Sequence, residues 1–187
     1  MRKKGKGITE RRGSTREPKI MILYIVRHAW AGHHGDPDWP DDDERPLSAG
    51  GKKRFAAMAQ ILAGLGVLPS VVATSPLVRC VQTAELLAEA VGDQMGKPPA
   101  LVEFDALRPG SDLDSLVAWT REQAEEHDEV AWVGHAPDVG RLAGILIGGS
   151  PGIRFAKAGV AAIRFDGKPA PGDGELRWLV TAKMLGY

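Results

Sequence analysis

The chain has 187 residues and a mass of 20.0 kDa, with 43% hydrophobic and 26% charged residues. These values are typical of one soluble globular domain and exclude a disordered or fibrous chain. The single cysteine, Cys80, excludes an intramolecular disulfide and any metal site built from several cysteines. No apolar run approaches the roughly 20 residues of a membrane span, so we expect a protein of the reducing cytoplasm.

The charge is unevenly distributed, although 24 basic and 24 acidic side chains sum to zero. The first twenty residues hold eight basic and two acidic side chains, so the rest of the chain carries a net charge of −6. Residues 1–19 are almost free of apolar side chains and are predicted to be a disordered basic arm, with Met21 as an alternative start of translation. The acidic body, residues 20–187, is predicted to be the folded domain, and we expect neither nucleic acid nor a membrane as its partner.

Apolar, β-branched runs alternate with segments of helical period along this body. Five strands are predicted: Ile20–Val26, Val71–Thr74, Val130–Gly134, Val160–Phe165 and Leu176–Thr181. Four helices are predicted between them: one after a Ser48 cap, one from Pro76 with Ser75 as its cap, one after Ser111 with Asp114 as a capping box, and one from about Asp138 to Leu146. This alternation predicts an α/β fold in three layers, with a mostly parallel central sheet covered by helices on both faces. The Pro/Gly-rich segment Lys168–Gly174 predicts a hairpin between the last two strands.

Three short motifs follow predicted strands at their carboxyl ends. They are Arg27-His28-Ala29, Ser75-Pro76-Leu77-Val78-Arg79 and Gly134-His135-Ala136-Pro137. In open α/β sheets, ligands bind beyond the carboxyl ends of the strands, so the motifs are expected to meet in one crevice. Two arginines there favour a phosphoryl ligand, because guanidinium groups match phosphate oxygens. A histidine can act as the nucleophile toward phosphorus.

The combination of these motifs resembles the histidine phosphatase superfamily, with its phosphoglycerate mutase-like fold. Arg27-His28-Ala29 resembles the family's Arg-His-Gly signature, with alanine in place of glycine. Residues 45–51 (RPLSAGG) and 75–84 (SPLVRCVQTA) resemble two further elements, and Gly134-His135 resembles the late Gly-His motif. The similarity extends from about Met21 to the C-terminus.

The resemblance implies His28 as the phosphorylated nucleophile, with Arg27, Arg79 and His135 forming the phosphate pocket. It also implies Arg45 as a substrate-binding residue. The family uses no metal or other cofactor, so His33, His34 and the acidic cluster are interpreted as a solvated loop; the acids are Asp36, Asp38, Asp41, Asp42, Asp43 and Glu44.

The residues at the place of the family's general acid indicate the substrate class. Mutases and many acid phosphatases of the family carry a glutamate general acid in a Leu-x-Glu element, whereas this chain has Leu107-Arg108-Pro109. An alkoxide leaving group needs a positioned proton donor, while the imidazole of phosphohistidine can be protonated near neutral pH before it leaves. With the short length, this favours the SixA type, which acts on phosphohistidine in proteins. Asp36, Asp38 and Asp105 are alternative candidates for a general acid.

Two alternatives follow from these observations. The first is a phosphomonoesterase acting on a small metabolite such as a sugar or nucleotide phosphate. The second is a catalytically idle module that binds phosphorylated partners, which the retention of both histidines and both arginines disfavours. The sequence does not indicate an oligomeric state.

Overall fold

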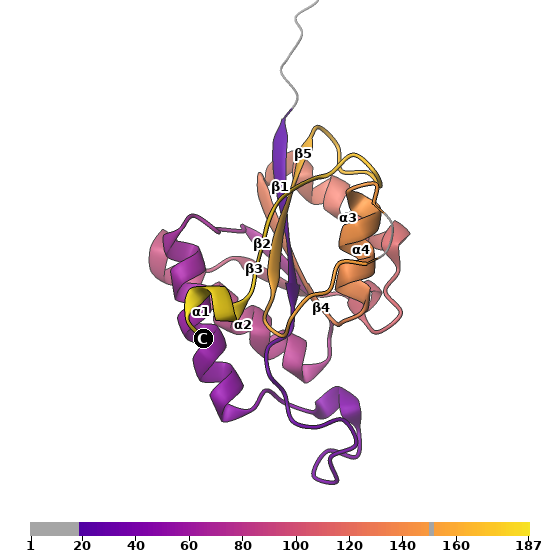
Figure 1. Cartoon of the computed structure of the whole chain (residues 1–187). Helices are drawn as coiled ribbons and strands as arrows, with labels where there is room; N and C mark the ends of the chain where they lie inside the picture. Colours follow the sequence, from indigo (N-terminus) through magenta and orange to yellow (C-terminus); the bar gives the residue numbers. More distant parts are fainter. Residues whose placement is uncertain (1–18, 150–151) are drawn as a thin grey trace, which may run out of the picture.

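The computed structural model describes residues 19–149 and 152–187, and it contains one six-stranded sheet in the order β3-β2-β4-β1-β5-β6 (Figure 1). The strands are β1 (Ile20–Arg27), β2 (Val71–Thr74), β3 (Ala100–Glu103), β4 (Glu129–Gly134), β5 (Val160–Asp166) and β6 (Glu175–Val180). The first four strands are mutually parallel, while β5 and β6 are antiparallel additions at one side. The predicted arm, apart from Lys19, lies outside the described residues.

Four helices form the outer layers, and Figure 1 shows them on opposite faces of the sheet. The helices are α1 (Ala49–Gly64), α2 (Val78–Met95), α3 (Leu113–Glu126) and α4 (Asp138–Leu146). α1 and α2 share a core with Tyr24 and Val26, whereas α3 and α4 share the opposite core with Leu23 and Ile25. Successive residues of β1 thus lie in opposite cores, so both faces of the strand are buried, which explains its continuous apolar run. The predicted three-layer α/β architecture is confirmed, and none of the helices described is long and apolar enough to cross a membrane.

The parallel register brings the three motifs to one edge of the sheet. Arg27 at the end of β1 pairs with Gly134 at the end of β4, and Thr74 at the end of β2 pairs with Val133. The residues that follow these strand ends therefore emerge side by side, although more than a hundred residues separate the first motif from the last.

The edge strand β3 is absent from the sequence prediction. Its residues are exposed except for Val102, which is half-buried. The strand pairs only with β2. A strand of four residues at a sheet edge has no buried face long enough to produce a recognisable hydrophobic pattern.

Two predicted helix starts differ from the structure. α2 begins at Val78 and has Leu77 as its N-cap without a side-chain bond, so the predicted start at Ser75-Pro76 is wrong by two residues. α3 is capped by Asp112 rather than Ser111, since the Asp112 carboxylate accepts hydrogen bonds from the backbone N–H groups of Asp114 and Ser115. The Ser48 cap of α1 and the span of α4 are confirmed.

The loop after β1 is fastened to the start of α1 through the carbonyl oxygen of Trp30. That oxygen accepts from the backbone N–H of Ser48 at 2.9 Å and from its hydroxyl at 3.2 Å. A Cβ atom added at Gly51 would overlap the same oxygen, whereas one added at Gly50 would meet open space. Glycine at position 51 therefore permits the close approach that closes this loop.

Substituting Gly51→Ala is expected to destabilise the fold by about 1–3 kcal/mol, because the added methyl group overlaps the Trp30 carbonyl. The matched control is Gly50→Ala, which is expected to be neutral or stabilising by up to about 1 kcal/mol, since alanine is the better helix former. Urea unfolding of both variants would measure the difference, and equal stabilities would contradict the proposed contact.

Candidate active site

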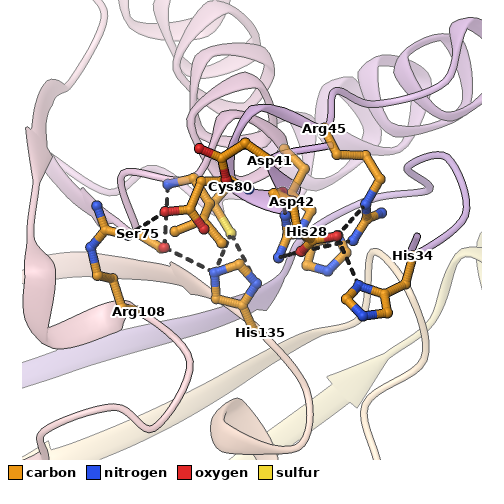
Figure 2. Close-up of polar contacts among 12 residues, drawn as sticks. His28, His34, Asp41, Asp42, Arg45, Ser75, Cys80, Arg108 and His135 are labelled. Carbon is orange, nitrogen blue, oxygen red and sulfur yellow. Dashed lines mark hydrogen bonds and ion pairs between the residues drawn. The ribbon is translucent and has the colours of Figure 1, made fainter. Parts of the chain in front are cut away.

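The two predicted site histidines lie beside each other at the carboxyl edge of the sheet (Figure 2). His28 follows β1 and His135 follows β4, and their ring centroids are 5.4 Å apart with the planes tilted by 58°. Only 8% of His28 and 4% of His135 is exposed. The structure therefore brings together, in a largely desolvated position, two imidazoles that the sequence separates by more than a hundred residues.

The tautomer of His28 is fixed by its neighbour. Nδ1 lies 2.8 Å from the carbonyl oxygen of Ala29, which can only accept, so Nδ1 carries the proton and Nε2 keeps a free lone pair. The Ala29 N–H donates to the Thr83 hydroxyl, which in turn donates to the Arg79 carbonyl. Burial lowers the pKa of His28 from 6.5 to about 3, with smaller contributions from nearby positive groups. A neutral imidazole with an available Nε2 is the form that acts as a nucleophile.

His135 is held by Ser75 and Cys80. A hydrogen bond of 2.9 Å joins its Nε2 to the Ser75 hydroxyl, and the Cys80 Sγ lies 3.4 Å from the same nitrogen. Burial, followed by the charge of Arg79, lowers the pKa of His135 to about 4. Burial also raises the pKa of Cys80 to about 12, so the thiol stays protonated and packs as a small core side chain.

Arg79 and Arg27 provide positive charge on this edge. Arg79 lies in the first turn of α2 and is 4% exposed, while Arg27 is half-buried and donates to the Phe155 carbonyl oxygen at 2.8 Å. Burial lowers the pKa of both groups. Among the residues described, the Nε atom of each arginine is buried without a hydrogen-bond partner. Unsatisfied buried donors are costly, so these atoms favour the binding of an anion.

One carboxylate of the acidic loop, that of Asp42, contacts Arg79. The 3₁₀ turn η1 (Asp42–Glu44) places the Asp42 carboxylate 3.1 Å from Arg79 and 2.8 Å from Arg45, and His34 lies 2.9 Å away. The second terminal nitrogen of Arg79 donates to the Asp42 backbone carbonyl at 2.7 Å. Hydrogen bonding from Arg45 is the main cause that holds the pKa of Asp42 well below its usual range.

Comparison with known proteins identifies the family. Residues 23–141 match the model of the histidine phosphatase superfamily, branch 1. An uncharacterized protein of Picosynechococcus is 35% identical over 170 residues, which cover 88% of this chain and 99% of that protein. The chain belongs to the histidine phosphatase superfamily.

Within the superfamily, the similarity is to the SixA type. Phosphohistidine phosphatase SixA of Escherichia coli is 29% identical over 159 residues, covering 84% of this chain and 92% of that protein. The structure of the protein histidine phosphatase SixA complexed with tungstate superposes with a TM-score of 0.74 at 28% identity, covering 88% and 99% of the two chains. The chain is thus a SixA-type phosphatase of this superfamily.

Arg45, the predicted substrate-binding residue of this phosphatase, is 8% exposed and occupied within its own loop. Its Nε and one terminal nitrogen contact the Asp42 carboxylate, and the other terminal nitrogen donates to the Gly32 carbonyl oxygen at 2.8 Å. In this arrangement Arg45 acts on the pocket through Asp42, and a direct contact with substrate stays a prediction.

The three candidate acids have other partners or lie apart from the histidines. The Asp36 carboxylate accepts from the backbone N–H of Asp38. Asp105 accepts from Arg108 at 2.9 Å, and Arg108 also donates to Asp43 at 2.7 Å, which links the acidic loop to η2 (Asp105–Leu107). In residues 19–149 and 152–187, no hydrogen bond or ion pair joins any of these three carboxylates to His28 or His135.

The sequence prediction missed Ser75 and Asp42 as members of the site. Ser75 was interpreted as a helix cap, and its hydroxyl does accept from the Leu77 N–H at 3.4 Å, but the same hydroxyl also holds His135. Asp42 was one of six acids in a loop interpreted as solvated. The spacing of Asp42 three residues before Arg45 is the only signal in the sequence that separates it from the others. Over the part of the chain that the structure describes, no group of three or more potential ligands is arranged to hold a metal ion.

The depressed pKa values make the fold sensitive to acid. Between pH 6.5 and about 4, both histidines stay neutral in the folded protein but bind protons in the unfolded chain, so stability falls as the pH falls. The His28→Asn substitution keeps a hydrogen-bond donor for the Ala29 carbonyl. It removes one of the two groups that bind a proton in the unfolded chain but not in the folded protein. The variant should lose about 1.4 kcal/mol less per pH unit than the wild type over this range.

Urea unfolding at pH 6.5, 5.5 and 4.5 would measure these slopes. The same substitution at His33, which is exposed on the acidic loop, is the control and should keep the wild-type slope. Identical slopes for the His28 variant and the wild type would show that His28 is not buried as a neutral group.

Proposed function

We propose that this phosphatase removes the phosphoryl group from phosphohistidine in a protein, without a metal ion and through a phosphorylated His28 intermediate. The observation that carries the proposal is the state of His28, a buried neutral imidazole with its Nε2 lone pair available. Arg27 and Arg79 lie nearby, and their Nε donors have no hydrogen-bond partner among the described residues. Such a site combines a nucleophile with fixed positive charge for the phosphoryl oxygens.

The reaction proceeds in two displacements at phosphorus. The Nε2 lone pair of His28 attacks, the bond from phosphorus to the substrate imidazole breaks, and that imidazole leaves with the electron pair and with a proton taken up from solvent. Water then attacks the phosphorus atom of phospho-His28 and gives up a proton to solvent. The bond from phosphorus to Nε2 breaks, its electron pair returns to Nε2, and inorganic phosphate leaves. Arg27 and Arg79 hold the equatorial oxygens in both steps, and His135, whose ring lies beside that of His28, donates to the same group.

The leaving group distinguishes phosphohistidine from a phosphomonoester. An alkoxide needs a proton donor, worth about 10²–10⁴ in rate, and the candidate carboxylates of Asp36 and Asp105 are engaged by Asp38 and Arg108. An imidazole has a pKa near 6.5, so it can take up a proton from solvent before it leaves and needs no positioned donor. The similarity to phosphohistidine phosphatase SixA of Escherichia coli supports the same substrate class.

The covalent intermediate can be trapped. Rapid acid-free quenching during turnover of a ³²P-labelled phosphohistidine protein should yield a phosphoenzyme that survives alkali and is lost in acid, as expected for a phosphoramidate. The His28→Ala variant should yield none, and EDTA should leave the wild-type yield unchanged. Turnover by the wild type with no detectable phosphoenzyme, when quenched on the timescale of a single turnover, would contradict the covalent route.

The substrate class can be tested separately with a panel. A phosphohistidine-containing protein and small phosphomonoesters, including sugar and nucleotide phosphates, would be compared by kcat/KM, with His28→Ala as the background control. We expect kcat/KM to be at least about 10²-fold higher for the phosphohistidine protein, because a general acid contributes at least that factor to the cleavage of an ester. A preference of that size for a monoester would identify the protein as a metabolite phosphatase instead.

A further inference from the structure

The anion-binding face of Arg79 is already in contact with an acid of the chain itself. One terminal nitrogen donates to the Asp42 backbone carbonyl at 2.7 Å, and the other lies 3.1 Å from the Asp42 carboxylate. Figure 2 shows Arg45 and His34 around the Asp42 carboxylate, with dashed lines for their contacts. Because a carboxylate and a phosphoryl group use the same guanidinium donors, Arg79 cannot offer both terminal nitrogens to a phosphoryl group while it holds Asp42.

The Asp42 carboxylate has a second set of partners that does not belong to the pocket. Arg45 donates to both of its oxygens, at 2.8 and 3.3 Å, and His34 lies 2.9 Å from one of them. These partners come from the same loop, whereas Arg79 comes from α2. Asp42 can therefore release Arg79 and remain paired, which keeps the cost of the exchange low compared with leaving a charge unpaired.

The surrounding contacts hold Asp42 near Arg79. The next residue, Asp43, pairs with Arg108 at 2.7 Å, and the backbone N–H of Leu47 donates to the Gln82 side chain on α2 at 2.9 Å. The residues that follow Asp42 are thus attached both to Arg108 and to α2. After a phosphate ion leaves, the carboxylate is in place to contact Arg79 again.

We propose that Asp42 sets the affinity of the pocket for phosphate, because its carboxylate competes with the phosphoryl group for Arg79. The inference rests on the proposed function, since it takes Arg79 as a ligand of the phosphoryl group. The competition weakens the binding of inorganic phosphate and speeds its release as product, and substrate overcomes it through additional contacts with the rest of the phosphorylated protein.

The test is the affinity for inorganic phosphate and for tungstate, measured by calorimetry on the whole chain. Asp42→Asn removes the charge and keeps the shape, and we expect it to bind both anions about tenfold more tightly, the effect of one partly buried ion pair. The matched control is Asp41→Asn, which removes the same charge one residue earlier, where asparagine still caps the 3₁₀ turn. It should change the affinities by less than about twofold.

The outcomes separate this inference from the proposed function. Unchanged or weaker binding by Asp42→Asn, or equal tightening by Asp41→Asn, would overturn the competition while leaving a working phosphatase. A wild type that neither binds phosphate nor hydrolyses phosphohistidine would overturn the proposed function as well. Should Asp42→Asn fail to fold, the carboxyl ¹³C resonance of Asp42 in the wild type gives the answer: it should shift when phosphate saturates the site, and a fixed resonance would contradict the exchange.

Discussion

Arg79 is a charged side chain placed where water is nearly absent, and the site is organised around that cost. A buried guanidinium is tolerated only when its donors are satisfied. The chain supplies Asp42 for the two terminal nitrogens and leaves Nε without a described partner. Asp42 thus stabilises the buried charge between reactions, while the Nε donor without a described partner favours the binding of an external anion.

The same desolvation controls the two histidines. An imidazole on the surface would be partly protonated near pH 6.5 and would repel the adjacent arginines as a cation. Burial keeps His28 and His135 neutral. The Ala29 carbonyl selects the tautomer of His28, so its reactive nitrogen is available without a dedicated general base. The loss of stability at low pH and the nucleophilicity at neutral pH therefore have one physical origin.

The sequence was sufficient for features that depend on local pattern. Continuous apolar runs and their alternation with helical segments predicted the layers and the strand ends, and hence the meeting of His28 with His135. The edge strand β3 was missed because its side chains are exposed. The start of α2 was misplaced because Ser75 suits a cap, while in the fold its hydroxyl also binds His135. The role of Asp42 depends on Arg79, 37 positions away, and no local pattern encodes such a contact.

The contacts that close the loop after β1 separate changes in the outer part of the loop from changes that would move the site. The Trp30 carbonyl and the bridge between Ala31 and Leu47 close the loop at its base. The hydrogen bonds described for residues 35–40, between His34 and Asp41, stay within the loop, so the length and composition of this segment can vary without moving His28 or the start of α1. Members of this architecture can thus acquire new protein partners through a surface segment while the chemistry beneath it stays constant.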